Sequence, residues 1–452
     1  MNISKKVLET LRAWHRQPSG ELLARLGVSR PSLMRAVAEL DGQVVSRGRA
    51  RRTAYAARRS LRGQMVPLPL YRIDKLGRAH EAGLLEPIYP SGCAMSFAEP
   101  FAWPLDDEMT DGWFRGIPYP VADMRPQGFL GRNLAHQFAT IMQVDEDVQR
   151  WSEDDVMHVL CMLGWDQPGN YILGEPALRR YLEAQQQDTH FLTDDEITTV
   201  YPLRATQALN YGVAGSSAAG EFPKFIERRV INTPTHVIVK FSGADGSPQE
   251  QRWSDLLICE HLALNTISDT LLLSAAKSRI YQFSGRTFFE VERFDRHGTF
   301  GRSGVCTWHE LNFALFGETG PWSEGAKAML TAGTISEETS QHIHLLEHFG
   351  RLIANTDMHN GNLAFLPDLK LAPAYDMLPM LYAPQRGMEL VERKFAPALP
   401  LPKERSTWLK AAKAAVVFWQ RAASDERISE RFRLISRTNA IQVEALLATQ
   451  RD

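Results

Sequence analysis

The stretch Asn355-Thr356-Asp357-Met358-His359-Asn360-Gly361-Asn362, followed by Tyr375-Asp376-Met377, decides how the rest of this sequence is interpreted. An Asp, an Asn five residues later and a second Asp further on are what a phosphoryl-transfer site needs. Asp357 would accept the proton of an attacking hydroxyl, and Asn362 and Asp376 would hold the Mg²⁺ that bridges the nucleotide phosphates. Because the protein-kinase catalytic loop has the same spacing, the stretch predicts an ATP- and Mg²⁺-dependent kinase.

A loop of small residues precedes this stretch and includes Gly215, Ser217 and Gly220. Small residues let backbone amides approach phosphate oxygens closely. The loop is a weak signal by itself, because it matches no standard phosphate-binding motif and a flexible connector has a similar composition. Its position, upstream of a strand that carries a lysine, favours a phosphate loop.

That strand spans 236–241, and Lys240 on it is interpreted as the lysine that pairs with the nucleotide phosphates. Kinases pair this lysine with a Glu on the following helix, which we expect over 251–268. Both Asp255 and Glu260 lie on that helix, and the sequence leaves the choice between them open.

Histidines before and within the catalytic stretch are interpreted as structural. His344 and His348 share a helix face at a spacing of four, but no third ligand accompanies them, so ordinary helix positions are favoured over a metal site. We expect His359 to hold the loop rather than to act as a general base.

The composition is that of a soluble globular protein, with 44% hydrophobic and 23% charged residues in 452. The four cysteines form no CxxC pair, which argues against a zinc ribbon or a disulfide framework and favours a reducing cytoplasm. The start of the sequence has no apolar signal segment, and no apolar run reaches the ~18 residues of a membrane span. We therefore expect a cytoplasmic protein without a membrane partner.

The charge is uneven along the chain. Residues 1–62 carry fourteen Lys and Arg against four Asp and Glu, a net charge of +10, which leaves −12 for the remainder of a chain whose net charge is −2. A basic segment attached to an acidic body indicates a nucleic-acid-binding module, and such a protein could also associate with the nucleoid.

Helical spacing over 4–15, a short helix ended by Gly27 and a third helix capped by Ser29 predict a helix-turn-helix. A basic hairpin over 44–56 would complete a winged helix. The side chains that would face DNA through the major groove, the minor groove or the phosphates are Ser29, Arg30, Ser32, Arg35, Arg47, Arg49, Arg51 and Arg52. DNA binding through such a module is often dimeric, so a homodimer is one expected state.

The motifs together resemble those of the HipA family of serine/threonine kinase toxins, over about residues 65–440. The resemblance rests on the catalytic stretch and on three further motifs, Leu371-Ala372-Pro373-Ala374-Tyr375-Asp376, Glu292-Arg293-Phe294-Asp295-Arg296 and Gly220-x-x-Pro223-Lys224. It implies an enzyme that phosphorylates protein substrates, notably aminoacyl-tRNA synthetases, with Glu292 and Phe294 at the nucleotide hinge. It also implies autophosphorylation in the phosphate loop, at Ser217 rather than Ser216.

Two features depart from the family pattern. Gly220-Glu221-Phe222 stands where Gly-Ala-Gln is usual, and a standard HipA chain has no winged helix of its own. The YjjJ-type branch carries such a segment and is the closer resemblance. We therefore expect an α+β fold with a two-lobed, kinase-like (HipA-like) body. The expected domains are a winged helix-turn-helix over 1–62, a small β-rich subdomain over 63–135, a kinase N-lobe over 136–300 and a helical C-lobe over 301–452.

Two alternatives from other functional classes remain. The chain could be a DNA-binding transcription regulator whose kinase-like body senses a ligand, although the intact Asp357, Asn362 and Asp376 argue against a body without chemistry. It could also be a metal-dependent nuclease toxin, since two-metal hydrolysis uses carboxylates too, but the lysine strand and the glycine loop would then be unexplained.

Overall fold

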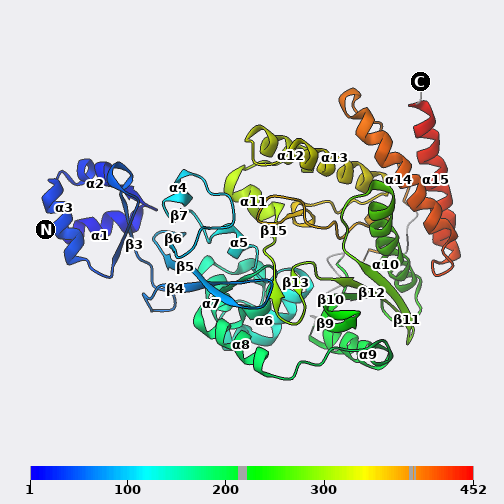
Figure 1. The fold of residues 1–452 in the computed structure, drawn as a ribbon, viewed down its shortest axis with the longest axis horizontal. Helices are drawn as coiled ribbons and strands as arrows, with labels where there is room; N and C mark the ends of the chain where they lie inside the picture. Colours follow the sequence, from blue (N-terminus) through cyan, green and yellow to red (C-terminus); the bar gives the residue numbers. More distant parts are fainter. Residues whose placement is uncertain (1, 212–220, 386–389, 391–392, 451–452) are drawn as a thin grey trace. The chain divides into compact units, whose positions relative to one another are not determined.

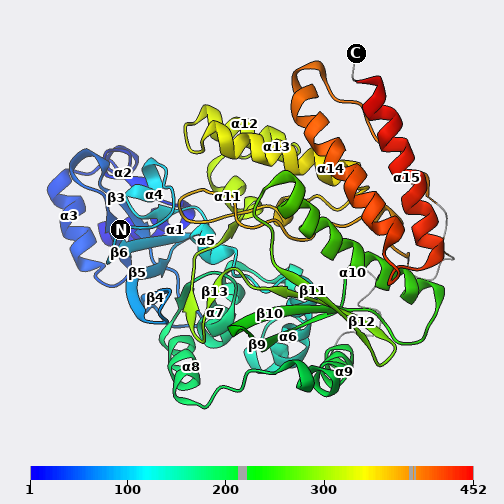
Figure 2. The same cartoon turned by 45° about the vertical axis from the view of Figure 1, so that its right-hand side comes forward.

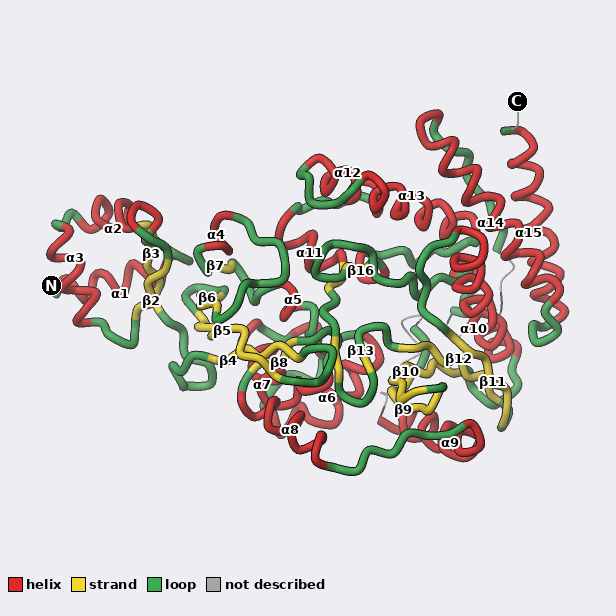
Figure 3. The backbone as a smooth tube through the Cα atoms, viewed as in Figure 1, coloured by secondary structure: helices red, strands yellow, loops and turns green. Residues whose placement is uncertain are grey.

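The computed structural model describes residues 2–211, 221–385, 390 and 393–450. The chain divides into two compact units, which we describe separately. The first comprises Met1–Arg125 and Phe138–Thr189, and the second comprises Pro126–Gln137 and His190–Asp452. Helices and strands are mixed throughout both units, as the sequence predicts (Figures 1 and 3).

The first unit begins with three helices and a small sheet. The helices are α1 (Ile3–Ala13), α2 (Ser19–Leu26) and α3 (Arg30–Glu39). β1 (Gln17–Pro18), β2 (Val44–Arg47) and β3 (Ala54–Ala57) form an antiparallel sheet in the order β1-β3-β2, with the short 3-10 helix η1 (Ala50–Arg52) between β2 and β3. Gly27 ends α2 in the left-handed conformation, and the Ser29 hydroxyl accepts a hydrogen bond from the Ser32 amide at the start of α3.

A five-stranded antiparallel sheet follows in the order β7-β6-β5-β4-β8. Its strands are β4 (Leu68–Ile73), β5 (Ala79–Pro87), β6 (Cys93–Phe97), β7 (Trp113–Phe114) and β8 (Tyr171–Leu173). The accompanying helices are α4 (Asp107–Thr110), α5 (Tyr119–Ala122), α7 (Glu153–Leu163) and α8 (Glu175–Gln186). Because β8 pairs with β4, this domain continues well past residue 135, where the sequence analysis placed its end. A strand of three residues carries too weak a pattern to be recognised in advance.

The second unit contains a four-stranded antiparallel sheet in the order β11-β12-β10-β9. Its strands are β9 (Lys224–Ile231), β10 (Thr233–Phe241), β11 (Ser278–Phe283) and β12 (Arg286–Glu292). Val237, Val239 and Phe241 pack into one core cluster with residues of α9 (Asp194–Tyr211). Because side chains alternate along a strand, Lys240 points to the other face, where α10 (Pro248–Thr266) packs (Figure 2).

Helices make up most of the remainder of this unit. They are α11 (Trp308–Leu315), α12 (Trp322–Thr331), α13 (Glu337–Leu352), α14 (Arg405–Ser424) and α15 (Glu430–Thr449), and α14 packs against α10, α13 and α15. Three short strands, β13 (Arg296–His297), β14 (Gly301–Arg302) and β15 (Cys306–Thr307), precede α11, and β16 (Ala364–Phe365) lies between α13 and α14 in the sequence. The pairing of β15 with β16 and a hydrogen bond from the Trp308 amide to the Leu363 carbonyl fix the segment that follows the predicted catalytic loop.

α6 (Gly128–Met142) begins in the second unit and ends in the first. Over the described ranges, none of the helices is long and apolar enough to span a bilayer.

Candidate active site and nucleic-acid interface

The lysine predicted to contact nucleotide phosphates lies between two carboxylates. Lys240 Nζ donates to Glu260 Oε1 and Oε2 at 2.7 and 2.8 Å and is also hydrogen-bonded to Asp376 Oδ1. The structure therefore selects Glu260 over Asp255 as the partner on α10. Asp255 instead accepts hydrogen bonds from the Ser429 amide and hydroxyl, at 2.8 and 2.6 Å, and so fastens α10 to the start of α15.

Burial and charge set opposite protonation tendencies for the two carboxylates. Burial raises the pKa of Glu260 to about 7, although the charge of Lys240 pulls it down. Burial would also raise the pKa of Asp376, but the charges of Lys240 and Lys224 outweigh it and lower the pKa to about 2. Asp376 is thus ionised at neutral pH, whereas Glu260 titrates near it.

Asn355 connects the two ends of the predicted catalytic stretch. Its side chain is buried, and its Oδ1 accepts a hydrogen bond from the Asp357 amide at 3.0 Å. Its Nδ2 donates to the Asp376 carbonyl at 3.3 Å. This residue fixes Asp357 relative to Asp376, a role that the sequence analysis did not assign. The available signal was an Asn two residues before an Asp, a spacing that favours a local side-chain-to-backbone turn.

The loop after Asp357 is held by several contacts. Asn362 Nδ2 donates to the Asp357 carbonyl at 2.8 Å, and the Tyr375 hydroxyl donates to the Gly361 carbonyl at 2.7 Å. His359 Nδ1 accepts from the Gly361 amide at 3.0 Å, while the His359 carbonyl accepts from Trp322 Nε1 at 3.2 Å. His359 thus makes the loop-holding contacts that the sequence analysis expected of it.

Asn362 and Asp376 suit the magnesium ion that they are predicted to hold. Magnesium usually keeps several waters and takes one or two carboxylates together with substrate phosphates. The hydrogen bond of Asn362 Nδ2 to the protein backbone leaves its Oδ1 as the ligating atom, and Asp376 supplies an ionised carboxylate. Within the described part of the chain, no group of three or more His, Cys, Asp and Glu side chains forms a metal-binding cluster. One amide oxygen and one carboxylate fit an ion that is shared with phosphates.

The predicted hinge follows β12. Glu292 is the last residue of that strand and forms an ion pair with Arg279 at 3.1 Å. The Phe294 ring lies 6.0 Å from the ring of Tyr375, the residue that precedes Asp376 in the sequence.

The predicted phosphate loop is not described by the structure. Its three predicted nucleotide-binding residues, Gly215, Ser217 and Gly220, lie outside the described residues.

Basic side chains of the N-terminal segment fall into two groups. Ser29, Arg30 and Arg35 are exposed at and after the start of α3, where Ser32 is half-buried, and Arg49 and Arg51 are exposed between β2 and β3. In the second group, half-buried Arg47 is hydrogen-bonded to Glu86, and exposed Arg52 forms an ion pair in which its Nη2 lies 2.6 Å from Asp111 Oδ1.

These ion pairs belong to an interface with the five-stranded sheet. Val45, Ala54 and Ala56 share one buried cluster with Ile88, Ala94 and Trp113. Glu86 is only 5% exposed and also pairs with Arg58 at 2.5 Å. DNA contact by Arg47 and Arg52 stays a prediction, but it would compete with these pairs. Arg30, Arg35, Arg49 and Arg51 are therefore the better candidates.

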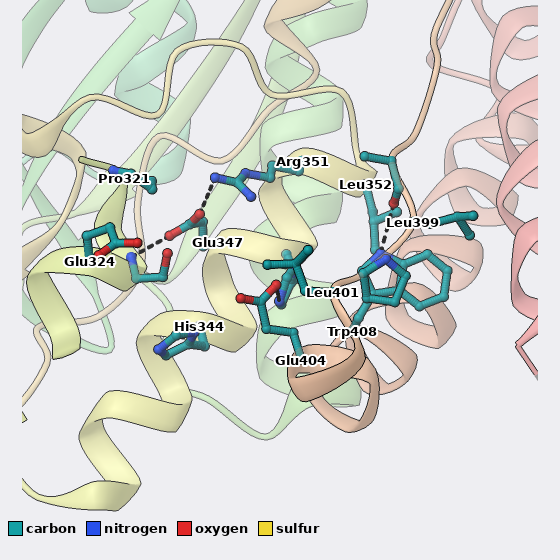
Figure 4. Close-up of a pocket in the computed structure, with 14 residues that line it drawn as sticks. Pro321, Glu324, His344, Glu347, Arg351, Leu352, Leu399, Leu401, Glu404 and Trp408 are labelled. Carbon is teal, nitrogen blue, oxygen red and sulfur yellow. Dashed lines mark hydrogen bonds and ion pairs between the residues drawn. The ribbon is translucent and has the colours of Figure 1, made fainter.

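A pocket of about 240 Å³ lies elsewhere in the second unit, along α13 (Figure 4). His344 and His348 both line it, and His348 Nε2 lies 3.9 Å from Glu404 Oε2. Burial lowers the pKa of His348, so its ring is neutral at neutral pH. Glu347, also in the wall, accepts a hydrogen bond from the Ser323 amide at 2.5 Å. None of the predicted catalytic residues lines this pocket.

Comparison with known proteins identifies two regions of the chain. Residues 64–182 match the middle domain of YjjJ-like toxins, and residues 216–440 match the HipA-like C-terminal domain. The middle-domain match agrees with the extent of the first unit beyond residue 135. Toxin YjjJ of Escherichia coli (strain K12) is 34% identical over 423 residues, which cover 92% of each chain.

Solved structures resemble the chain more distantly. A HipA chain from the Shewanella oneidensis MR-1 complex of HipA, HipB and operator DNA has 14% identity and a TM-score of 0.49, and the match covers 85% of this chain and 96% of the other. The Helicobacter pylori proinflammatory kinase CtkA has 14% identity and a TM-score of 0.37, with coverages of 51% and 90%.

The two domain matches and the identity over 92% of each chain agree with the resemblance noted in the sequence. This chain belongs to the YjjJ-type family of HipA-like toxins.

Proposed function

We propose that this protein is an ATP- and Mg²⁺-dependent serine/threonine protein kinase of the HipA toxin type. The observation that carries the proposal is the centre formed by Lys240, Glu260 and Asp376. Asn355 supports this centre, because its side chain is hydrogen-bonded to the backbone of both Asp357 and Asp376. A lysine paired with a helix carboxylate beside a metal-binding Asp is the arrangement that aligns nucleotide phosphates in kinases.

Each side chain has a defined task in this proposal. Asp357 is exposed at the surface of the loop, where it can accept the proton of a substrate hydroxyl. Lys240 donates to the nucleotide phosphates, and Glu260 keeps its ammonium group oriented. Asn362 and Asp376 would hold Mg²⁺, which when bound neutralises the charge that develops on the transferred phosphoryl group. Glu292 and Phe294 would contact the nucleotide base.

The target is a hydroxyl on another protein, for which the family resemblance suggests an aminoacyl-tRNA synthetase. By the same resemblance we propose autophosphorylation at Ser217, which lies outside the described residues. A phosphate there would add about −1.5 to −2 charges where the nucleotide phosphates bind, and would therefore inhibit the enzyme.

Incubation of the protein with γ-labelled ATP and Mg²⁺ tests the proposal. We expect label on the protein itself and on a target in cell extract, and we expect neither with Asp357→Asn or Asp376→Asn. Undiminished labelling in both variants would refute the kinase assignment. Phosphoproteomic comparison of cells expressing wild type and Asp357→Asn would then identify the target, and a plasmid-nicking assay on the same preparations tests the nuclease alternative.

We also propose that residues 1–62 are a winged helix-turn-helix that binds DNA and serves autoregulation. The supporting observation is the exposed basic side chains on α3 and between β2 and β3. HipB and operator DNA accompany HipA in the Shewanella complex, whereas this chain carries its own basic segment. Binding of the full-length protein to its own promoter should weaken steeply with salt, because each phosphate contact releases counterions. Promoter binding that is absent or insensitive to salt would contradict this proposal.

A further inference from the structure

The Glu221 carboxylate, three residues before β9, interacts with three donor groups. Lys224 Nζ lies 2.7 Å from its Oε1, and Arg132 Nη2 donates to its Oε2 at 3.0 Å. The backbone amide of Phe129 donates a third hydrogen bond. Burial would raise the pKa of Glu221, but these partners outweigh it and lower the pKa, so the carboxylate is ionised at neutral pH.

The Phe129 end of this contact is anchored in the hydrophobic core. Phe129 is 1% exposed and packs in the same core cluster as Phe225, Val237 and Val239 of the sheet. Gly128, at the start of α6, has a positive φ of +58°, and a Cβ there would lie 2.5 Å from Glu221 Oε1. Only glycine lets the carboxylate approach the helix start this closely.

Lys224 connects Glu221 to the candidate active site. It is the register partner of Lys240 in the pairing of β9 with β10, so both side chains leave the same face of the sheet. The charge of Lys224 lowers the pKa of both Asp376 and Glu260. The electrostatic potential at this centre therefore depends on where the Lys224 ammonium is held.

We propose that Glu221 and Arg132 are positioning residues that hold the Lys224 ammonium beside Asp376 and Glu260 and thereby set the affinity for nucleotide phosphates. The inference rests on the proposed kinase function. It also gives a role to Glu221, which occupies a position where the family pattern has alanine. A lone lysine loses rotamer entropy when it binds phosphate, which weakens binding. Because Glu221, fixed by Arg132, already holds the Lys224 side chain in one conformation, less entropy is lost on binding.

Three variants disturb the contact in different ways. Glu221→Gln removes the charge, Arg132→Met removes the outer partner, and Gly128→Ala displaces the carboxylate without changing any charge. Arg132→Lys keeps a cation and serves as the conservative rescue. Glu227→Gln is the matched control, because Glu227 is on the opposite face of the same strand and pairs with Arg204 at 2.9 Å.

We expect the three disruptive variants to raise the KM for ATP about tenfold, because binding would then have to order the freed lysine side chain. The kcat should change less than about twofold. Arg132→Lys should remain within about threefold of wild type, and Glu227→Gln should match it. Calorimetric titration with ATP and Mg²⁺ should show the same order of affinities without any transfer step.

An unchanged KM in the variants that fold, or a fall in kcat at constant KM, would overturn the inference, as would an equal effect of Glu227→Gln. Thermal unfolding identifies any variant that does not fold, and Arg132→Met and Arg132→Lys change only a half-buried side chain. If wild type binds ATP but transfers no phosphate, the kinase proposal fails, while the order of ATP affinities still decides the role of Glu221.

Discussion

Replacement of Glu260 by glutamine should change the stability and the proposed activity of this protein in opposite directions. The Glu260 side chain is 2% exposed and lies against Lys240. Burial raises its pKa from the ordinary 4.5 to about 7. Glutamine has nearly the same shape and is always neutral, so Glu260→Gln resembles the wild-type protein with Glu260 protonated.

The sign of the stability effect follows from the direction of the pKa shift. The pKa of Glu260 is higher in the folded than in the unfolded chain, so folding favours its protonated form. That stabilisation is complete below about pH 4.5 and is lost as the pH rises through about 7. Because glutamine cannot ionise, the variant should be at least as stable as wild type at pH 8, by at most about 3 kcal/mol.

The rate should change in the opposite direction. Glu260 holds the Lys240 ammonium by an ion pair only when its carboxyl group is ionised. Because its pKa is about 7, the ionised fraction rises from about one tenth at pH 6 to about nine tenths at pH 8. We expect Glu260→Gln to lower phosphoryl transfer about a hundredfold at pH 8, the scale for loss of one group that stabilises developing charge. The loss should shrink to about tenfold at pH 6.

Two measurements test this reasoning. Urea unfolding at pH 5 and pH 8 gives the stability difference, and initial rates of phosphate transfer between pH 5.5 and 8.5 give the acidic limb of the profile. Asp255→Asn is the matched control, since Asp255 lies on the same helix and binds Ser429, so the acidic limb should persist in that variant. An acidic limb that survives in Glu260→Gln, or a large loss of stability at pH 8, would refute the argument.

Three further outcomes are expected. Arg229→Met should lower the free energy of unfolding, measured by urea denaturation, by about 3–5 kcal/mol. The reason is that Glu290 loses the partner 2.9 Å away, and both side chains are 0% exposed. A loss below about 1 kcal/mol would contradict this. Arg30→Ala should weaken DNA binding and reduce the slope of log affinity against log salt by about 1, as seen in fluorescence anisotropy. Arg47→Ala should instead lower the thermal unfolding temperature with little change in that slope, because Arg47 is paired with buried Glu86. A reduced slope in Arg47→Ala and an unchanged slope in Arg30→Ala would show that Arg47, and not Arg30, contacts DNA.

Local sequence determined much of this architecture. Three local patterns predicted helices where the structure has them: the serine at the start of α3, the glycine after α2 and the apolar spacing of α1. Each pattern spans only a few residues. The spacing of Asp357, Asn362 and Asp376 likewise predicted a candidate site, because a catalytic loop would be a continuous segment of the chain. The order of the motifs along the chain was sufficient to recognise the HipA-like family.

Tertiary structure decided what local patterns could not. Asp255 and Glu260 are five residues apart on α10, so they point about 140° away from each other around the helix. Only the packing of α10 shows that Glu260 faces Lys240, whereas Asp255 faces α15. Arg47 and its partner Glu86 are 39 residues apart, and Glu221 and its partner Arg132 are 89 residues apart, so local patterns could not predict these pairs. The strand β8 is too short for the sequence to predict that it pairs with β4. Helix caps and loop spacings are encoded locally, but the partner of a charged side chain depends on which segments the fold brings together.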